Sequence, residues 1–575
     1  MTRTDSFVVG TLVLLLAIVA GLIGVPAIQL AVAPISPAPD PSGKIIEARP
    51  YVEGVLGASV SVTPLTARTQ VDRDLVALVF AGLVRQGPDG AMIPDLAERW
   101  AVDPTGTTWT VDLRGDARWH DGQPVTADDV VFTIRTLQDP EYHGPSATSW
   151  TEVTVAKVDR LRVTFTLETP LGGFLQALTQ PLAPAHLLGD VLVSELPDDP
   201  FGQLPVGSGP FALVDLTETS ASLIPAGVDD STVEPDPSGV DSFATARPTE
   251  RPTRPVPYLP GIEFRFFTTP DDLAAAFRAG DLDGASGLSP QLAAELGAED
   301  GVRLLRYPGS TLTAVLLNLR PSHPEFGAAT VRTGLLAAID RSRLIDEAFA
   351  GSARGTTGPI PPSSWLFDAA ADPPVAHDRA AAGKGFRAAD WTRKEDGWYL
   401  PKATKPLSIE VLSPTQGANP GLFAAAKAVV RDWMAMGLVV THVPLPPGIF
   451  VTDRLATGTF AVALADVTIG LDPDLYPLLA SSQTLTGGSN VMGVQDTALD
   501  VLLAAARKPG TDEQRITAYS ALQKQLAKGR YLLPLAFADE VVVVRDTLEG
   551  VAIGQVTDPS DRFWDVLTWR LAVDR

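Results

Sequence analysis

The segment from Leu96 to Phe132 constrains the fold of this 575-residue chain more than any other part of the sequence. Within it, Trp109–Leu113 (WTVDL) alternates apolar and polar residues, which is the period of a strand with one buried face. The run RWHDGQPV then supplies turn residues, and Thr126 is a candidate helix N-cap. Two aspartates follow in the first turn, where the helix dipole favours negative charge. The segment therefore predicts a strand, a turn and a helix in succession.

Length and composition exclude several classes of protein. At roughly 150 residues per domain, a chain of this length predicts about three or four compact units, and a hydrophobic content of 45% supports large cores. The formal net charge of −23 argues against nucleic acid as a partner and favours neutral or cationic ligands. The chain has no cysteine, which excludes disulfides, cysteine-based zinc sites, a cysteine nucleophile and a lipid-modified cysteine anchor.

The N-terminus carries an uncharged stretch from Phe7 to Val25 that is long enough to span a membrane as a helix. We predict a transmembrane signal-anchor over residues 7–30 that leaves residues 1–6 in the cytoplasm. The alternative is a secretory signal peptide cut after Ala31-Val32-Ala33, which fits the A-x-A pattern. Residues 31–48 then form a Pro-rich linker. Both interpretations place the remaining chain on the extracytoplasmic face of the cell membrane, and the first anchors it there by the N-terminal helix.

The order of residues around the opening segment resembles a known signature. L-A-E-x-W, D-x-T-G-T-T-W-T and W-H-D-G-x-P-V-T-A-D-D-V-V-F follow one another between Leu96 and Phe132. This order resembles the signature of the family 5 extracellular solute-binding proteins, the oligopeptide- and dipeptide-type binding proteins of ABC importers. A second run, from Val331 to Ile345 (VR followed by AAIDRSRLI), resembles another motif of the same family.

The resemblance implies an α/β fold, namely the two-lobed periplasmic-binding-protein clamshell of type II, in its large peptide-binding subclass. Such a protein carries an extra subdomain in its N-terminal lobe, and here one N-terminal transmembrane helix would precede it. We expect lobe one to comprise residues 49–310 and 541–575, with the subdomain at about 85–200, and lobe two to comprise residues 311–540. Residues 227–257 are rich in Pro, Ser, Thr, Asp and Arg, which predicts a mobile surface insertion.

The resemblance also implies a function without catalysis. We expect a receptor that captures a peptide or a similar small solute between its lobes by hinge closure and delivers it to ABC permease subunits in the membrane. We expect a monomer that needs no cofactor and no metal. The alternative is a membrane-tethered sensor or scaffold with the same clamshell fold but no transport role. An extracytoplasmic hydrolase is disfavoured, because the sequence lacks H-E-x-x-H and G-x-S-x-G motifs.

Candidate ligand-binding residues follow from the resemblance. Peptide-binding members pair a buried carboxylate with the amino terminus of the ligand, and the Asp-Pro-Asp segment after a predicted strand makes Asp472 the first candidate. The alternative role for Asp472 is that of an N-cap or turn residue. Asp466 would add a second negative charge and favour an amine-bearing substrate. Asn318, Ser413 and Thr415 are further candidates by position.

Overall fold

The computed structural model describes residues 49–572, apart from 88–89, 145–149, 151, 228–256 and 485–487. The predicted membrane helix at 7–30, the linker at 31–48 and nearly all of the predicted insertion at 227–257 lie outside the described residues. Among the residues that are described, no helix is long and apolar enough to cross a membrane.

The opening segment folds as its sequence predicts. Strand β5 (Thr108–Leu113) is followed by a turn and by helix α3 (Ala127–Leu137). The Thr126 hydroxyl accepts a hydrogen bond from the backbone N–H of Asp128, and the Asp129 carboxylate accepts one from the backbone N–H of Thr126 at 2.8 Å. This reciprocal capping satisfies donors that would otherwise be unpaired at the helix start.

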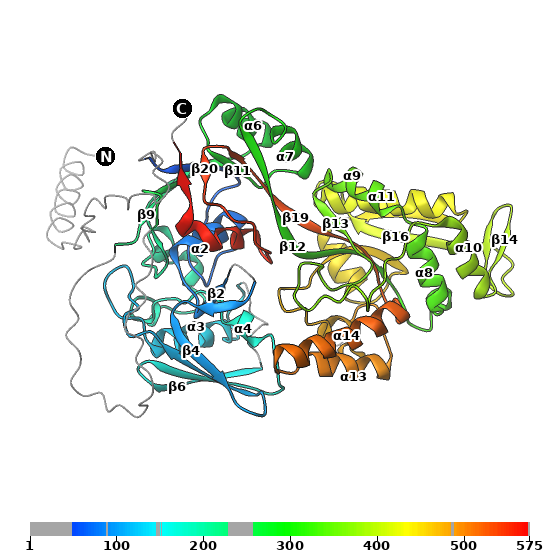
Figure 1. Cartoon of the computed structure of the whole chain (residues 1–575), viewed down its shortest axis with the longest axis horizontal. Helices are drawn as coiled ribbons and strands as arrows, with labels where there is room; N and C mark the ends of the chain where they lie inside the picture. Colours follow the sequence, from blue (N-terminus) through cyan, green and yellow to red (C-terminus); the bar gives the residue numbers. More distant parts are fainter. Residues whose placement is uncertain are drawn as a thin grey trace, which may run out of the picture. The chain divides into compact units, whose positions relative to one another are not determined.

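One sheet of eleven strands extends through both lobes of the described chain. Its order is β17 (Val439–Leu445), β16 (Ser408–Pro414), β18 (Val462–Thr468), β12 (Val302–Leu317), β19 (Leu533–Arg545), β11 (Gly284–Ser286), β1 (Tyr51–Leu56), β10 (Ile262–Phe267), β9 (Ser220–Pro225) and β8 (Phe211–Leu216), with β13 (Ala353–Gly355) beside β19. The long strands β12 and β19 run antiparallel from the pair Val302–Arg545 to the pair Val315–Leu533. Figure 1 shows that these two strands lead from one lobe into the other.

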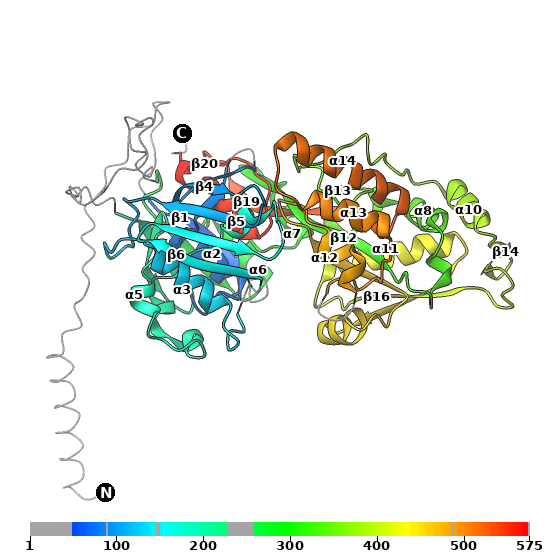
Figure 2. The ribbon, with the colours of Figure 1, turned by 90° about the horizontal axis from the view of Figure 1, so that it is seen from below.

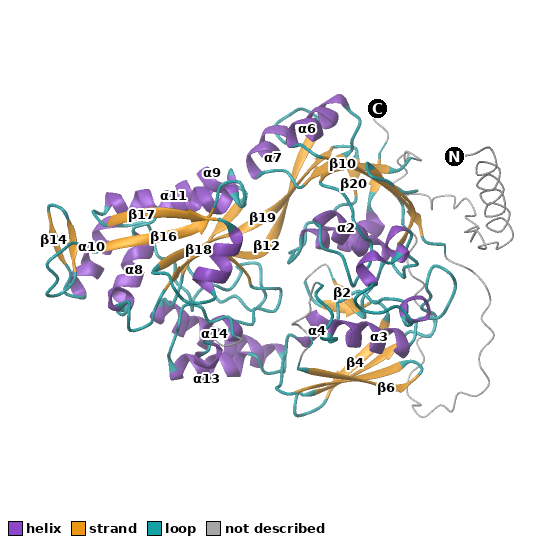
Figure 3. Cartoon of the chain, turned by 180° about the vertical axis from the view of Figure 1, so that it is seen from behind, coloured by secondary structure: helices purple, strands orange, loops and turns teal. Residues whose placement is uncertain are grey.

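The fold is α/β and has two lobes, each with its own buried apolar clusters. The clusters of the first lobe draw on residues 51–307 and 541–571, and those of the second draw on residues 312–537. In the second lobe, Val462 and Leu464 of β18 belong to one cluster, whereas Ala463 and Ala465 belong to another. Because side chains alternate along a strand, both faces of this part of the sheet are covered. Figure 3 shows helices on both sides of these strands.

The helices divide between the two lobes as the clusters do. In the first lobe they are α2 (Gln70–Val79), α3, α4 (Phe174–Ala177), α5 (Ala185–Leu188), α6 (Pro270–Ala279), α7 (Pro290–Leu296) and the 3₁₀ segments η1 (Leu196–Asp198), η2 (Pro200–Gln203) and η6 (Pro559–Thr568). In the second they are α8 (Ala329–Ala337), α9 (Arg341–Phe349), α10 (Arg379–Ala388), α11 (Pro420–Ala435), α12 (Tyr476–Leu479), α13 (Thr497–Ala506), α14 (Asp512–Gly529), the 3₁₀ segments η3 (Pro324–Phe326) and η5 (Ser481–Gln483), and the π-helix η4 (Ile449–Leu455).

A smaller sheet supports the first lobe. It has four antiparallel strands in the order β4 (Ala97–Val102), β5, β7 (Arg162–Leu167) and β6 (Val153–Asp159), and Figure 2 shows α3 close to it. Trp109, Trp150 and Phe165 pack around Phe174, with ring centroids 5.5–5.9 Å from it. Three two-stranded pairs complete the structure: β2 (Val84–Gln86) with β3 (Met92–Pro94), β14 (Thr392–Lys394) with β15 (Gly397–Tyr399), and β20 (Leu548–Glu549) with β21 (Arg570–Leu571).

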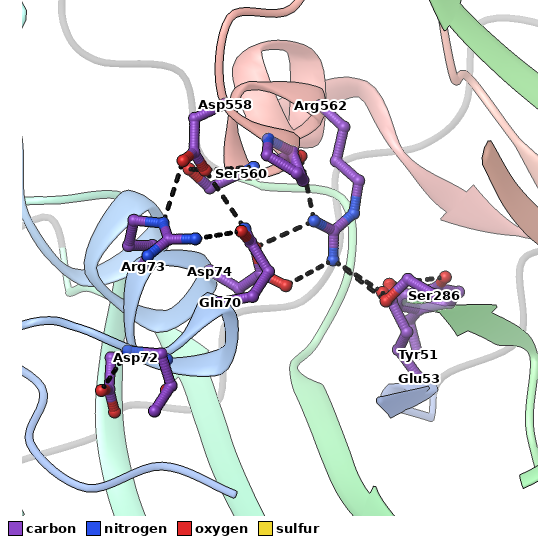
Figure 4. Close-up of polar contacts among 12 residues, drawn as sticks. Tyr51, Glu53, Gln70, Asp72, Arg73, Asp74, Ser286, Asp558, Ser560 and Arg562 are labelled. Atoms are coloured by element: carbon purple, nitrogen blue, oxygen red, sulfur yellow. Dashed lines mark hydrogen bonds and ion pairs between the residues drawn. The ribbon is translucent and has the colours of Figure 1, made fainter. Parts of the chain in front are cut away.

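A buried charge cluster joins four elements of the first lobe (Figure 4). Arg562 of η6 is 1% exposed and donates to both carboxylate oxygens of Asp74 on α2, at 2.9 and 2.8 Å, and to Glu53 on β1 at 2.7 Å. The hydroxyls of Tyr51 and Ser286 donate to the same Glu53 carboxylate at 3.0 and 2.6 Å. Because every charge is paired and hydrogen-bonded, the cluster can be buried without an isolated ion.

We predict that Arg562→Met lowers the free energy of unfolding by about 3–5 kcal/mol, because it leaves two carboxylates buried without their cation. Urea denaturation at pH 7 measures the loss. The matched control is Arg278→Met, which removes exposed ion pairs to Glu295 and Glu299 and should cost far less, because solvent screens these charges. Equal losses for the two variants would contradict the assigned role of the cluster.

Candidate functional site

A cavity of about 1410 Å³ lies at the boundary between the two lobes. Ligand pockets usually measure roughly 300–1,000 Å³, so this cavity is large enough for an extended solute. Its first-lobe wall is formed by α2, β2, η6 and the segment that leads into α4, and its second-lobe wall is formed by Leu471, Asp472 and Asp474. Aromatic side chains of Phe80, Phe563 and Trp564 give the first-lobe wall an apolar surface. We call this space the interlobe cavity.

The buried charge cluster reaches the wall of the interlobe cavity. Arg73 and Asp558, which line the cavity, form an ion pair at 2.9 Å. Gln70 donates to Asp558 at 3.1 Å and to Asp74 of the cluster at 2.9 Å, as Figure 4 shows. Asp561 also lines the cavity, and burial raises its pKa to about 6. This part of the wall therefore carries more carboxylates than guanidinium groups.

Asp472, the first sequence candidate, lies on the cavity wall, but a cation of the protein already pairs with it. Arg515 of α14 donates two hydrogen bonds to its carboxylate, at 2.6 and 2.8 Å, and the Tyr519 hydroxyl donates a third at 3.3 Å. The guanidinium of Arg515 also lies 5.6 Å from the ring of Trp365, which is 46% exposed. A bidentate pair of this kind neutralises the carboxylate locally. A ligand amine would have to share it with Arg515.

The same segment brings the two lobes into contact. The backbone N–H of Asp472 donates to the side-chain oxygen of Gln176 at 3.1 Å, and the backbone N–H of Gly172 donates to the carbonyl oxygen of Arg507 at 2.6 Å. A Cβ atom at Gly173 would lie 2.9 Å from Cγ of Asp472, so the close approach requires glycine there. We call these contacts the lobe contact.

Asp466 is exposed and projects from β18. Its carboxylate accepts hydrogen bonds from the Thr313 hydroxyl at 2.7 Å and from the Asn419 side-chain amide at 3.0 Å. Solvent reaches the carboxylate, yet the protein atoms crowded around it raise its pKa through partial burial. Its partners are neutral, and no ion pair to it exists among the described residues. No cation of the described chain therefore competes for Asp466, which does not itself line the interlobe cavity.

Protein contacts occupy the other three sequence candidates, and none of the three lines the interlobe cavity. Asn318 is 1% exposed, and its amide donates to the carbonyl oxygens of Gly458 and Phe460 at 3.0 and 2.7 Å. Ser413 is fully buried and hydrogen-bonds to His442 at 2.8 Å. Thr415 is half-buried and turns the chain into the loop before α11. No contact in the described structure tests whether these three residues face a ligand, so this role stays a prediction.

One charged residue near the site was missed by the sequence analysis. Glu540 lies on β19 opposite Tyr307 of β12, where the strand passes between the two lobes. Within the described chain its carboxylate has no hydrogen bond and no ion pair. Burial raises its pKa to about 7, and the carboxylates of Asp74 and Asp558 add to the shift, whereas Arg562 opposes it. The signal was available in the sequence, because Glu540 directly precedes the apolar run VVVV.

A family model for bacterial extracellular solute-binding proteins, family 5 (middle part), matches residues 91–489, which is more than half of the chain. The chain belongs to this family. It is accordingly a binding protein without enzymatic activity, and its two-lobed fold is that of its relatives.

Two curated relatives and one solved structure show how far this solute-binding protein is similar to known proteins. It is 27% identical to Protein XP55 of Streptomyces lividans over 86% of its own length and 85% of the relative. It is 23% identical to the dipeptide-binding protein of Pseudomonas aeruginosa over 86% of its length and 91% of the relative. The oligopeptide-binding protein AppA of Bacillus subtilis, solved with a nonapeptide, matches with a TM-score of 0.67 and 19% identity, covering 92% and 100% of the two chains.

We predict that Glu540 makes the stability of this solute-binding protein fall as pH rises. Its pKa is about 7 in the folded state against 4.5 for the free side chain, so the folded state binds more protons between these values. Below pH 4.5, Glu540 does not lower the free energy of unfolding. By pH 8 it lowers the free energy of unfolding by roughly 3 kcal/mol.

Glu540→Gln removes that penalty. Its gain in unfolding free energy over the wild type should therefore be larger at pH 8 than at pH 5, as measured by urea denaturation at both values. Asp561 and Asp565, which also have pKa values raised to about 6, are present in both proteins and cancel in the comparison. A gain that is the same at both pH values would contradict the assignment.

Proposed function

We propose that this protein is the substrate-binding receptor of an ABC importer and captures a peptide, or a similar small solute that carries an amine, in the interlobe cavity. The observation that supports this most is the cavity itself, because about 1410 Å³ at the boundary of two lobes suits an extended ligand held from both sides. Membership of the family supports the substrate-binding role. The identity of the solute is our proposal.

The preference for an amine rests on the distribution of charge. The chain carries a net charge of −23, and Asp466 and Glu540 are carboxylates without a cation partner in the described structure. Asp472 and Asp474 on the cavity wall are paired with Arg515 and Arg507 at 2.6 and 3.0 Å. Asp466 lies outside the lining of the interlobe cavity, and we propose that it attracts the amine of the incoming ligand, whereas Asp472, which lines the cavity, contributes mainly through the lobe contact. We propose that the other three candidates, Asn318, Ser413 and Thr415, support the wall of the interlobe cavity without lining it.

Closure and delivery complete the proposal. Ligand bound between the lobes favours the arrangement in which the lobe contact is made, because it adds interactions to both walls. The liganded receptor then docks on permease subunits in the membrane. We propose an extracytoplasmic location, with residues 7–30 as the tether and with the receptor acting as a monomer.

Ligand binding should be visible as a gain in the stability of the protein. Di- to pentapeptides and amines at 100 times their dissociation constant should raise the free energy of unfolding by about 2.7 kcal/mol, which a thermal-shift screen of the purified protein detects. Asp466→Asn should weaken the binding of an amine-bearing hit at least tenfold, whereas Asp453→Asn, which changes an exposed aspartate on η4, should not. If only oligosaccharides or metal chelates bind, the amine preference is wrong. If no class binds, the sensor or scaffold alternative gains support.

The lobe contact should be needed for tight ligand binding. Gly173→Val places side-chain atoms where Asp472 lies and should weaken ligand binding at least tenfold, because the two lobes can no longer approach as closely. Gly417→Val is the matched control, since a Cβ atom there meets no other atom within 4 Å. Isothermal titration calorimetry with a hit from the screen compares the two variants. Equal affinities would show that the lobe contact has no part in binding.

A further inference from the structure

The second lobe contains another cavity, of about 540 Å³, which shares no residue with the interlobe cavity. Its floor is the first turn of α9, with Arg341, Ser342 and Ile345, and its walls come from the chain between residues 355 and 377. Residues 356–377 contain no strand and no helix. We call this space the α9 cavity.

Buried polar atoms without a hydrogen-bond partner gather around the α9 cavity. Three of the several atoms of this kind in the described chain lie there: Nη1 of Arg341, Oδ1 of Asp372 and Nε of Arg530. Asp372 and Arg341 line the cavity, and Arg530 lies directly behind Thr357 and Asp372. Asp372 is 7% exposed and Arg530 is 5% exposed, so open solvent cannot satisfy them. Buried polar groups in native proteins nearly always have a partner, which here is either water or a small molecule inside the cavity.

Asp372, Arg530 and Arg341 do not satisfy these polar atoms by hydrogen bonds to one another. The Nη1 atom of Arg530 lies 3.7 Å from Oδ1 of Asp372, which is too long for a hydrogen bond, and donates to the carbonyl oxygen of Thr357 instead. Arg341 uses Nη2 to donate to the carbonyl oxygen of Val375 and leaves Nη1 unpaired. Backbone carbonyl oxygens thus hold Arg341 and Arg530, and each of the three side chains has one polar atom left over.

The charges around the cavity define the complementary molecule. Arg341 and the buried carboxylate of Asp372 both line the cavity, and Arg530 lies close enough to Arg341 for their mutual repulsion to lower the pKa of Arg341 beyond the effect of burial. At the rim, Asp340 caps α9 by accepting from the backbone N–H of Arg343, and His377 lies 3.7 Å from it. The first turn of α9 adds the positive end of a nine-residue helix. A bound molecule must therefore offer an anion to Arg341 and a hydrogen-bond donor to Asp372.

We propose that the α9 cavity is a second ligand site, distinct from the interlobe cavity, and that it binds a free α-amino acid. The carboxylate accepts from Nη1 of Arg341 at the start of α9, and the ammonium group donates to Oδ1 of Asp372. These two groups sit on one carbon in an α-amino acid, which matches a cation and an anion that line the same small cavity. The proposal does not depend on the solute held between the lobes.

Calorimetric titration of the full chain tests the proposal with four kinds of probe: individual free α-amino acids, acetate, methylamine and inorganic phosphate. We expect at least one amino acid to bind at least tenfold more tightly than acetate and methylamine, because each of these satisfies only half of the site. Acetate or phosphate binding as tightly as every amino acid would overturn the part played by the ammonium group. No binding of any probe would mean that water alone fills the cavity, and the proposal would be wrong.

Variants locate the binding. Asp372→Asn and Arg341→Gln should each weaken the amino acid at least tenfold, whereas Arg379→Gln, which changes an exposed arginine on α10, should not. Ala376→Trp fills the cavity from its exposed rim without touching a charge, so it keeps the test valid if a charge variant fails to fold. Gly173→Val, in the lobe contact, should leave amino acid binding unchanged. If it abolishes that binding while Asp372→Asn does not, the amino acid lies between the lobes and the second site does not exist.

Discussion

Backbone hydrogen bonds between β12 and β19 hold the two lobes together, and the rest of the structure depends on this pairing. The register runs from Val302–Arg545 in the first lobe to Val315–Leu533 in the second, and it shifts between Pro308 and Leu312. The apolar clusters change at the same place, from Tyr307 on one side to Leu312 on the other. A local irregularity in a ladder lets strands bend without loss of pairing on either side. The irregularity therefore falls between the two cores and interrupts neither of them.

Two charged residues near this junction differ in whether they have a partner. Arg562 pairs with Asp74 and Glu53 inside the first lobe and so ties β1, α2 and η6 together. Buried ion networks of this kind add little net stability but penalise every arrangement that separates their members. Glu540, by contrast, is left without a partner on the strand that crosses between the lobes. Its charge is thus free to respond to a ligand cation or to pH.

The sequence predicted the fold well where the local pattern and the chain order agree. Thr126, the candidate N-cap in the sequence, caps α3, and Asp129 completes the capping box three residues later. This prediction succeeds because capping depends on neighbours three residues away. The continuity of eleven strands in one sheet could not be predicted, since the neighbours of β19 come from β11 and β12 rather than from adjacent sequence. Long-range pairing leaves no local signature.

The candidate site was harder to predict, for the same physical reason. Asp472 lies on the cavity wall, but its partner Arg515 is 43 residues away on α14, and only the fold brings them together. Asn318 and Ser413 lie in strand-end positions that resemble ligand contacts in sequence, yet their side chains satisfy carbonyl oxygens and His442. A polar residue shows in sequence that it needs a partner, but not which partner it finds. The electrostatic preference of a site therefore follows from the carboxylates that remain without a cation after folding; of two such carboxylates in the described chain, Asp466 was a candidate from the sequence and Glu540 was not.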